Sequence, residues 1–222
     1  MTSMKKTLAI DVGGTNVKVL ATAQETPVKI PSGPAMTPAR MVQDVKQAAA
    51  DWKYDVVAIG YPGFVHRGKI VVEPHNLGQG WVGFDFEQGF GKPVKIINDA
   101  AMQALGSYDG GRMLFLGLGT GLGSALILDD VLEPMELAHL PYRKGRTFED
   151  YVGIRGLRRL GKKKWRAHVA RVVQQLKDTF EIDDVVLGGG NAKLLKDIPA
   201  GARLGANANA FKGGFRLWEQ KG

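Results

Sequence analysis

Apolar residues along the chain form short runs separated by glycine turns, and one such pattern occurs twice. The stretch LAIDVGGTNVKVL (8–20) has an apolar run, a glycine–threonine turn and a second apolar run, and LFLGLGTGLGSAL (114–126) repeats this outline. A tight turn between two apolar runs is typical of a β-hairpin. Two such hairpins predict a duplicated α/β unit, with one lobe over residues 1–109 and a second over residues 110–222.

The other apolar patterns alternate between strands and helices. Short apolar runs predict strands at 55–63, 93–97 and 184–191, and a small hairpin at 64–72. Apolar residues at helical spacing predict helices at 38–52, 98–105, 149–160 and 165–180. This alternation indicates a mixed α/β fold rather than a sandwich. The tail beyond Pro199 has no clear periodicity, and we expect it to pack back on the first lobe.

Composition changes this picture little. With 44% hydrophobic and 23% charged residues, the 222-residue chain resembles an ordinary globular protein. No apolar run approaches the roughly 20 residues of a membrane helix, so we expect a cytoplasmic protein with no membrane partner. The chain has no cysteine, which excludes disulfides and thiolate metal sites.

Positive charge is concentrated in one segment. Residues 143–171 carry 11 Lys and Arg against two acidic residues, whereas the net charge of the whole chain is +8. Such a block suits a polyanion such as nucleic acid, an acidic membrane or a phosphate-rich substrate. The alternative interpretation is a pair of solvated helix faces.

The two glycine turns are candidate phosphate-binding loops, because backbone N–H groups in tight glycine turns bind phosphate oxygens. The residues expected to contact phosphate are Gly13, Gly14, Thr15, Lys18, Gly119, Thr120 and Gly121. A third glycine cluster follows the strand at 184–191. Each turn taken alone is equally consistent with a simple change of chain direction.

Two aspartates follow predicted strands. Asp11 would be repelled by bound phosphate unless a metal ion intervened, and Mg2+ favours carboxylate and phosphate oxygens. Its alternative role is to bond the amides of the turn. Asp99 lies where ligands bind open α/β sheets and could accept a proton from a substrate hydroxyl. Its alternative role is a helix N-cap.

A second polar group has the side chains that recognise a polyol, which needs fixed hydrogen-bond partners on a rigid base. It comprises Glu136 and His139 in MELAH, Glu149 in FEDYVG, and Asn76 with Trp81 in HNLGQGW. Packed, structural roles for His139 and Trp81 are the alternative. His139 has no neighbouring cysteine or histidine with which to bind a metal.

These motifs occur in the order typical of one family. IDVGGTNVK, GYPGFV, NLGQGW, KPVKIINDA, GLGTGLGSALI and ELAH resemble the ROK sugar-kinase family, and KGRTFEDYVG, GKKKWRAHVARV and VVLGGGNAKLL resemble its zinc-free polyphosphate glucokinase branch. The resemblance covers residues 7–197. It implies an actin-like ATPase, ribonuclease H-like duplicated fold, with two α/β lobes around a cleft.

The resemblance also implies roles for individual residues. Asp11 is expected near Mg2+ and Asp99 as the catalytic base acting on the sugar 6-hydroxyl. The expected sugar-binding positions are Asn76, Asn98, Asp99, Glu136, His139 and Glu149. The expected adenosine-side segment is Gly188, Gly189, Gly190 and Asn191. The absent cysteines imply no zinc, and Ala138 in ELAH replaces the commoner glycine beside the sugar loop.

The expected protein is therefore a kinase, most simply a homodimeric glucokinase, that transfers phosphate from polyphosphate, ATP or both. A polyphosphate chain would follow a path of basic residues, namely Arg155, Arg158, Arg159, Lys162, Lys163, Lys164 and Arg166. The alternatives are a kinase for another hexose with ATP as sole donor and a non-catalytic sugar sensor. A nucleic-acid partner is not expected, because the basic block has no platform of stacking aromatic residues.

Overall fold

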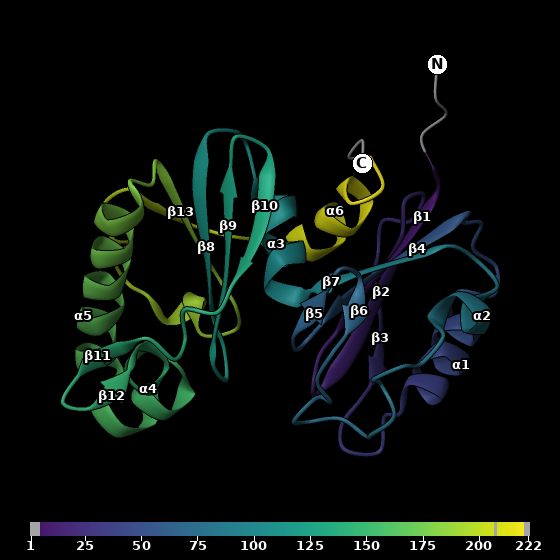
Figure 1. Ribbon diagram of the computed structural model, residues 1–222, viewed down its shortest axis with the longest axis horizontal. Helices are drawn as coiled ribbons and strands as arrows, with labels where there is room; N and C mark the ends of the chain where they lie inside the picture. The colour runs from purple at the N-terminus through teal and green to yellow at the C-terminus, as the bar shows by residue number, and fades with distance from the viewer. Residues whose placement is uncertain (1–4, 207, 220–222) are drawn as a thin grey trace. The chain divides into compact units, whose positions relative to one another are not determined.

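The computed structural model describes residues 5–206 and 208–219, and the chain divides into two compact units (Figure 1). The first unit comprises residues 1–106 and 210–222, and the second comprises residues 107–209. Each unit contains one five-stranded sheet with its own hydrophobic core. The α/β class predicted from the sequence is confirmed.

The first sheet has the strand order β3-β2-β1-β4-β7. β1 and β2 form the predicted hairpin, β3 continues it as an antiparallel edge strand, and β4 and β7 lie parallel to β1. The strands are β1 (Thr7–Val12), β2 (Asn16–Ala21), β3 (Val28–Pro31), β4 (Val56–Tyr61) and β7 (Val94–Asn98). A separate small hairpin pairs β5 (Val65–His66) with β6 (Lys69–Ile70).

The second sheet has the order β10-β9-β8-β13-β14 and repeats the strand directions of the first. β8 and β9 are the second predicted hairpin, β10 is antiparallel to β9, and β13 and β14 are parallel to β8. The strands are β8 (Arg112–Leu118), β9 (Leu122–Leu128), β10 (Val131–Met135), β13 (Asp184–Gly188) and β14 (Ala202–Leu204). The predicted duplication is therefore present as two sheets of identical topology.

Helices and short elements complete the two units. In the first unit these are α1 (Pro38–Ala48), α2 (Phe86–Phe90) and α3 (Asp99–Ser107), with α6 (Asn209–Arg216) near the end of the chain. In the second they are the hairpin β11 (Pro141–Arg143) and β12 (Arg146–Thr147), α4 (Phe148–Val152), α5 (Ile154–Phe180) and the 3-10 turn η1 (Ala192–Leu194). The Thr37-Pro38 start of α1 is confirmed, since the Thr37 side chain accepts a hydrogen bond from the backbone N–H of Arg40.

The C-terminal helix α6 packs on the first unit through two glycines. Gly213 lies directly against the backbone carbonyl of Met102 in α3, and Gly214 lies against Ala9 and Ala58 of the sheet. The following Trp218 donates a hydrogen bond to the carbonyl of Val57 at 3.0 Å. This helix has no counterpart in the sequence prediction, which found no periodicity there.

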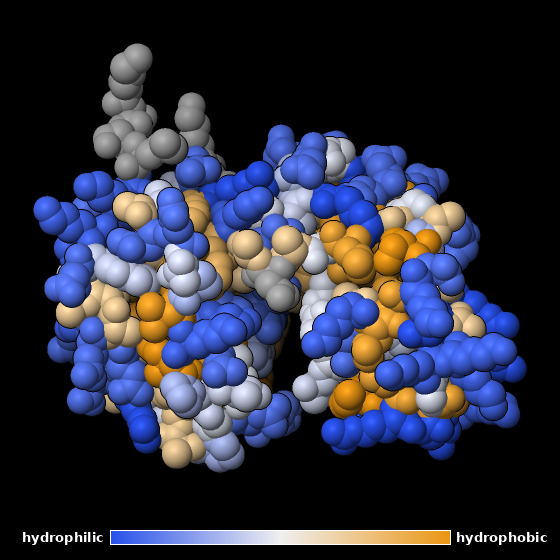
Figure 2. Space-filling model, turned by 180° about the vertical axis from the view of Figure 1, so that it is seen from behind, coloured by the Kyte–Doolittle hydropathy of each residue, from blue (hydrophilic) through white to orange (hydrophobic). Residues whose placement is uncertain are grey.

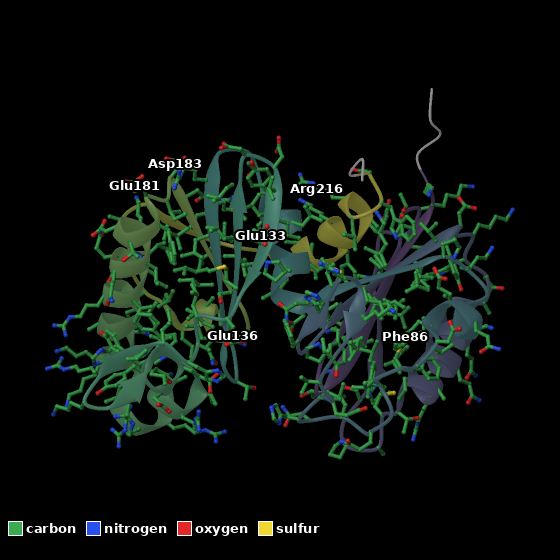
Figure 3. All side chains as sticks on the ribbon, in the orientation of Figure 1. Phe86, Glu133, Glu136, Glu181, Asp183 and Arg216 are labelled. Atoms are coloured by element: carbon green, nitrogen blue, oxygen red, sulfur yellow. The ribbon has the colours of Figure 1, made fainter. Side chains whose placement is uncertain are left out.

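On the face drawn in Figure 2, most side chains are hydrophilic, with apolar patches between them. Phe86, labelled in Figure 3, belongs to an aromatic group in the core of the first unit. Its ring centroid lies 6.1 Å from that of Trp81 and 4.8 Å from that of Phe84. In the described part of the chain, no helix is long and apolar enough to span a membrane.

Candidate functional site

The first glycine turn connects β1 and β2, and its backbone is fixed on both sides. The N–H of Gly13 donates to the carbonyl of Asn16 at 3.1 Å, and the Ser32 hydroxyl donates to the carbonyl of Gly13. A Cβ atom on Gly14 would lie 3.0 Å from Cβ of Asn76. The turn therefore lies against Asn76, and the close approach explains the absence of a side chain at Gly14.

Asp11 and Lys18 face each other across this hairpin. They are register partners on β1 and β2, and Lys18 Nζ lies 2.9 Å from Asp11 Oδ2. The Asp11 side chain is 13% exposed and that of Lys18 is 40% exposed. A carboxylate and an ammonium group thus lie beside the glycine turn, with the carboxylate the less accessible of the two.

Asp99 lies at the same edge of the sheet as Asp11. β1, β4 and β7 run parallel, with Asp11 opposite Gly60 and Gly60 opposite Ile97. Asp11, near the end of β1, and Asp99, just after β7, therefore lie at the carboxyl ends of the two strands that flank β4. Burial and then the negative charge of Asp11 raise the pKa of Asp99 to about 7. This edge is where open α/β sheets bind ligands.

The start of α3 is capped mainly by Asn98. Its side-chain oxygen accepts hydrogen bonds from the N–H groups of Ala100 at 2.9 Å and Ala101 at 3.2 Å, and its amide donates to the carbonyl of Gly63. Asp99 also accepts from Ala100 at 2.8 Å. Because Asn98 already serves the helix start, capping alone does not account for the carboxylate at Asp99.

Asn76 is exposed in the loop that follows β6, and Trp81 in the same loop is fully buried. Trp81 packs against Tyr61, with ring centroids 5.5 Å apart. Trp81 is therefore a core residue and offers no aromatic face to a sugar. Of these two candidates, Asn76 is the one that the structure leaves exposed.

The second glycine turn, between β8 and β9, packs on the start of α4 and α5. The carbonyl of Thr120 accepts a hydrogen bond from the N–H of Ile154 at 3.1 Å, and a Cβ on Gly121 would lie 2.5 Å from Oε2 of Glu149. The Thr120 side chain is exposed. The turn and the Glu149 carboxylate are therefore direct neighbours within the second unit.

The third glycine cluster, 188–190, lies on the same hairpin. The N–H of Asn191 donates to the carbonyl of Leu118 and its side-chain amide donates to the carbonyl of Gly119, both at 2.9 Å. Gly189 has φ +80°, and its Cβ position lies 2.6 Å from the carbonyl oxygen of Leu118. The two glycine segments of the second unit are thus in direct contact.

Gly189→Ala is expected to lower the free energy of unfolding by about 2 to 4 kcal/mol, because a positive φ and a close backbone contact both exclude a methyl group. Gly190→Ala is the matched control, since no atom lies within 4 Å of its Cβ position. Denaturant unfolding of both variants measures the difference. Equal stability of the two variants would show that the contact at Gly189 carries no constraint.

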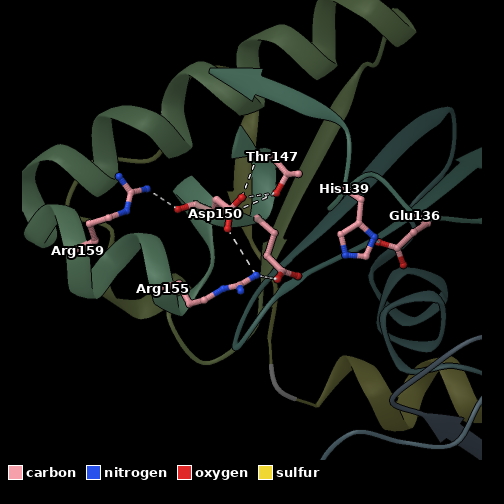
Figure 4. Close-up of polar contacts among 7 residues, drawn as sticks. Glu136, His139, Thr147, Asp150, Arg155 and Arg159 are labelled. Atoms are coloured by element: carbon pink, nitrogen blue, oxygen red, sulfur yellow. Dashed lines mark hydrogen bonds and ion pairs between the residues drawn. The ribbon is translucent and has the colours of Figure 1, made fainter. Parts of the chain in front are cut away.

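The remaining sugar-binding candidates lie in the second unit around α4 (Figure 4). Glu136, just after β10, and His139 are both exposed, and Oε1 of Glu136 lies 3.7 Å from Nδ1 of His139. Glu149 is more enclosed, and its carboxylate binds Arg155 at 2.8 Å. The backbone N–H of Glu149 donates to the carbonyl of Ala138 at 3.0 Å, which links the ELAH motif to α4.

The seven basic residues of the expected polyphosphate path, all in α5, fall into two groups. Arg155, Arg159 and Arg166 have partners within the unit: Glu149 and Asp150, the carbonyl of Asp150, and the carbonyl of Leu194, respectively. The other four are exposed, and their side chains make no hydrogen bond or ion pair within the described residues. They are Arg158, Lys162, Lys163 and Lys164. Gly161, with φ 72° and ψ 161°, kinks the helix just before the three lysines.

A cavity of about 480 Å³ lies at the opposite edge of the first sheet, away from Asp11 and Asp99. Its lining includes Lys6, Asp55 and Lys92, which precede β1, β4 and β7. The cavity is therefore separate from the candidate site. No group of three or more His, Asp and Glu side chains suited to a metal occurs within residues 5–206 and 208–219.

The model of the ROK family matches residues 7–133, more than half of the chain, and the protein belongs to the ROK family. Polyphosphate glucokinase of Mycobacterium tuberculosis is 25% identical over 211 residues, covering 85% of this chain and 79% of that protein.

Two solved structures share the fold at lower identity. The inorganic polyphosphate/ATP-glucomannokinase of Arthrobacter sp. strain KM has a TM-score of 0.79 and 23% identity, covering 97% of this chain and 98% of that one. A ROK-family transcriptional regulator, a homologue of the E. coli MLC protein, has a TM-score of 0.75 and 16% identity, covering 98% and 78% of the two chains. The duplicated sheets and these neighbours establish the actin-like ATPase fold, which kinases and regulators of the family share.

Proposed function

We propose that this protein is a sugar kinase that transfers a phosphoryl group to the 6-hydroxyl of glucose or a related hexose. The observation that carries the proposal is the pair of carboxylates at one sheet edge, with the pKa of Asp99 raised to about 7. A general base works best when its pKa lies near the working pH. A regulator that only binds sugar needs no base, and turnover therefore separates the kinase from the sensor.

In the proposed reaction the sugar oxygen attacks the terminal phosphorus of the donor. The O–P bond to the sugar forms as the P–O bond to the donor breaks, and the hydroxyl proton passes to Asp99. The products are the sugar 6-phosphate and either ADP or a polyphosphate shortened by one unit. Phosphoryl transfer depends mainly on positioning and charge stabilisation, so these residues supply little covalent chemistry.

The groups proposed to hold the donor are the backbone N–H groups and hydroxyls of the glycine turns, including Gly13, Gly14 and Thr15 in the first and Gly119, Thr120 and Gly121 in the second. Asp11 fits Mg2+, because this ion usually binds one or two carboxylates together with substrate phosphates. Mg2+ would neutralise charge on the phosphates. Lys18 adds a positively charged side chain beside Asp11, with its Nζ 2.9 Å from Asp11 Oδ2.

We further propose polyphosphate as one of the donors. Three lysines in succession follow the kink of α5, where the helix dipole disfavours positive charge. These lysines are exposed and have no side-chain partners within the described residues. Binding of an extended anion therefore explains them better than a structural role. The relatives named polyphosphate glucokinase and polyphosphate/ATP-glucomannokinase support this choice.

A coupled assay of glucose, mannose and fructose against ATP and long-chain polyphosphate tests the function directly. The proposal expects phosphorylation of glucose with polyphosphate and competition between the two donors. Turnover with ATP alone would favour the narrower hexose kinase. Sugar binding without turnover with either donor would identify a sensor and contradict the proposed reaction.

The pH dependence of kcat/KM follows from the raised pKa of Asp99. The base is active when ionised, so activity should be complete well above pH 7 and fall as the pH drops through about 7. Lys18 lowers the pKa of Asp99 through its positive charge, so Lys18→Met should move this acidic limb to higher pH. The measurement is the pH at which kcat/KM falls to half of its plateau value, which does not depend on the absolute rate of the variant.

Lys53→Met is the matched control for this shift, because Lys53 is an exposed lysine of the first unit at the opposite sheet edge. It removes the same charge far from Asp99 and should leave the limb in place. An unchanged limb in both variants would show that Asp99 is not the group that titrates.

A further inference from the structure

Glu73 binds three consecutive backbone N–H groups of the chain that follows it. Its Oε2 accepts from Gly80 and from Trp81, each at 3.1 Å, and its Oε1 accepts from Val82 at 3.0 Å. Hydrogen bonds to an ionised carboxylate are stronger than those between neutral groups. One side chain therefore closes the segment 73–82, here called the Glu73 loop.

The Glu73 loop is anchored to the core beside this carboxylate. Trp81 is fully buried against Tyr61, and the Tyr61 hydroxyl donates to the carbonyl of Val72 at 2.9 Å. The N–H of Gly78 donates to the carbonyl of Met36 at 3.0 Å. Between these fixed points the loop exposes Asn76, along with His75 and Gln79.

Asn76 is also the point where the Glu73 loop meets the first glycine turn. Its Cβ lies 3.0 Å from the Cβ position of Gly14. A shift of the loop by about one ångström would therefore change both the placement of the Asn76 amide and the contact with the turn. Misplacement on this scale is known to cost substantial activity in positioned sites.

We propose that Glu73 is a positioning residue for the acceptor sugar: its carboxylate fixes the Glu73 loop so that Asn76 is held against the first glycine turn. This inference rests on the proposed function, because it assigns Asn76 to the sugar. The hydrogen bonds that Glu73 accepts come from backbone groups, and we assign it no part in the transfer. Its hydrogen bonds hold the pKa of the carboxyl below its usual range, so the carboxylate stays ionised at neutral pH.

Glu73→Gln tests the proposal, since an amide has one acceptor oxygen and its NH2 group would face a backbone donor. The loss of charge-assisted bonds is expected to raise KM for glucose by about 10- to 100-fold. kcat should change much less, because Asp99, the proposed base, lies outside the Glu73 loop. Amide hydrogen exchange at Gly80, Trp81 and Val82 should become faster, as measured by NMR.

Glu87→Gln is the matched control, because Glu87 in the same unit accepts one backbone hydrogen bond, from Val94 at 3.1 Å. It should leave the sugar KM and the exchange of the Glu73 loop unchanged. Asn76→Ala provides a second, independent variant. If Glu73 acts through Asn76, the two substitutions combined should weaken sugar binding less than the sum of their separate effects.

Calorimetric titration with glucose separates this inference from the proposed function, because it requires no turnover. Weaker glucose binding by Glu73→Gln, coupled to Asn76→Ala, supports the positioning role even in a protein that does not phosphorylate. Unchanged binding, additive effects or unchanged exchange at residues 80–82 would overturn it while leaving the kinase intact. A wild-type protein that binds no hexose would overturn both.

Discussion

Asp99→Asn is expected to lower kcat by about 100- to 10,000-fold, the usual effect of removing a general base, while glucose affinity changes little. The substitution keeps an oxygen that can accept the hydrogen bond from Ala100, so α3 should still begin at the same place. It removes the group that takes the sugar proton. Steady-state kinetics with either donor, together with a glucose titration, separate the two effects.

Asp85→Asn is the control for the loss of a charge at a helix start. Asp85 caps α2 by accepting a hydrogen bond from the N–H of Gln88 at 2.8 Å. The kinase proposal requires this variant to keep its activity, because α2 carries none of the proposed site residues. If Asp99→Asn also turned over near the wild-type rate, Asp99 would serve only the helix.

The second large effect is expected from neutralising Lys162, Lys163 and Lys164 to glutamine. Three exposed cations at up to about 1 kcal/mol each give a loss in kcat/KM with polyphosphate of roughly 10- to 100-fold. A nucleotide carries fewer phosphates and should be affected far less. With polyphosphate as the donor, kcat/KM of this variant should also depend less on salt concentration than kcat/KM of the wild type. Fewer charged contacts then remain for salt to screen.

A triple variant of Lys29, Lys53 and Lys92 to glutamine is the matched control, since all three are exposed lysines of the first unit. It removes the same net charge and should leave polyphosphate use close to wild type. An equal loss with ATP and polyphosphate in the Lys162–Lys164 variant would refute the path. An equal loss in both triple variants would indicate a general effect of net charge.

The sequence predicted those elements whose apolar pattern is strong. The hairpins around Gly13 and Gly121 and the buried strands β4 and β13 have nearly continuous apolar runs, and burial on both faces of a sheet produces such runs. β7 was also predicted, although only its central residue is buried. The edge strand β3 was not predicted, because its four residues are only partly buried or exposed. Edge strands bury little surface, and the pattern that reveals a strand weakens accordingly.

Helix boundaries were harder to predict where glycine has a packing role. The sequence predicted helices at 149–160 and 165–180, and the break between them is confirmed by the non-helical backbone of Gly161. The end of α4 at Val152, followed by Gly153, was not predicted. α6 was missed because Gly213 and Gly214 disfavour a helix in isolation. In the structure the same glycines allow α6 to lie directly on Met102 and on the sheet, so packing outweighs propensity.

The candidate residues could be named from the sequence, but their physical state could not. The pKa of Asp99 depends on burial and on Asp11, which is 88 residues away in the chain. The role of Glu73 depends on backbone N–H groups, which carry no signature in the side-chain sequence. The glycine at residue 14 could be read as a turn signal, whereas its contact with Asn76 required coordinates.

Phosphorus NMR of the reaction of glucose with polyphosphate or ATP in the presence of Mg2+ tests the central claim most directly. The account predicts that the wild-type protein produces a phosphate monoester on the sugar 6-oxygen and that Asp99→Asn produces almost none in the same time. A monoester formed at the same rate by both proteins, or no sugar ester with either donor, would contradict it.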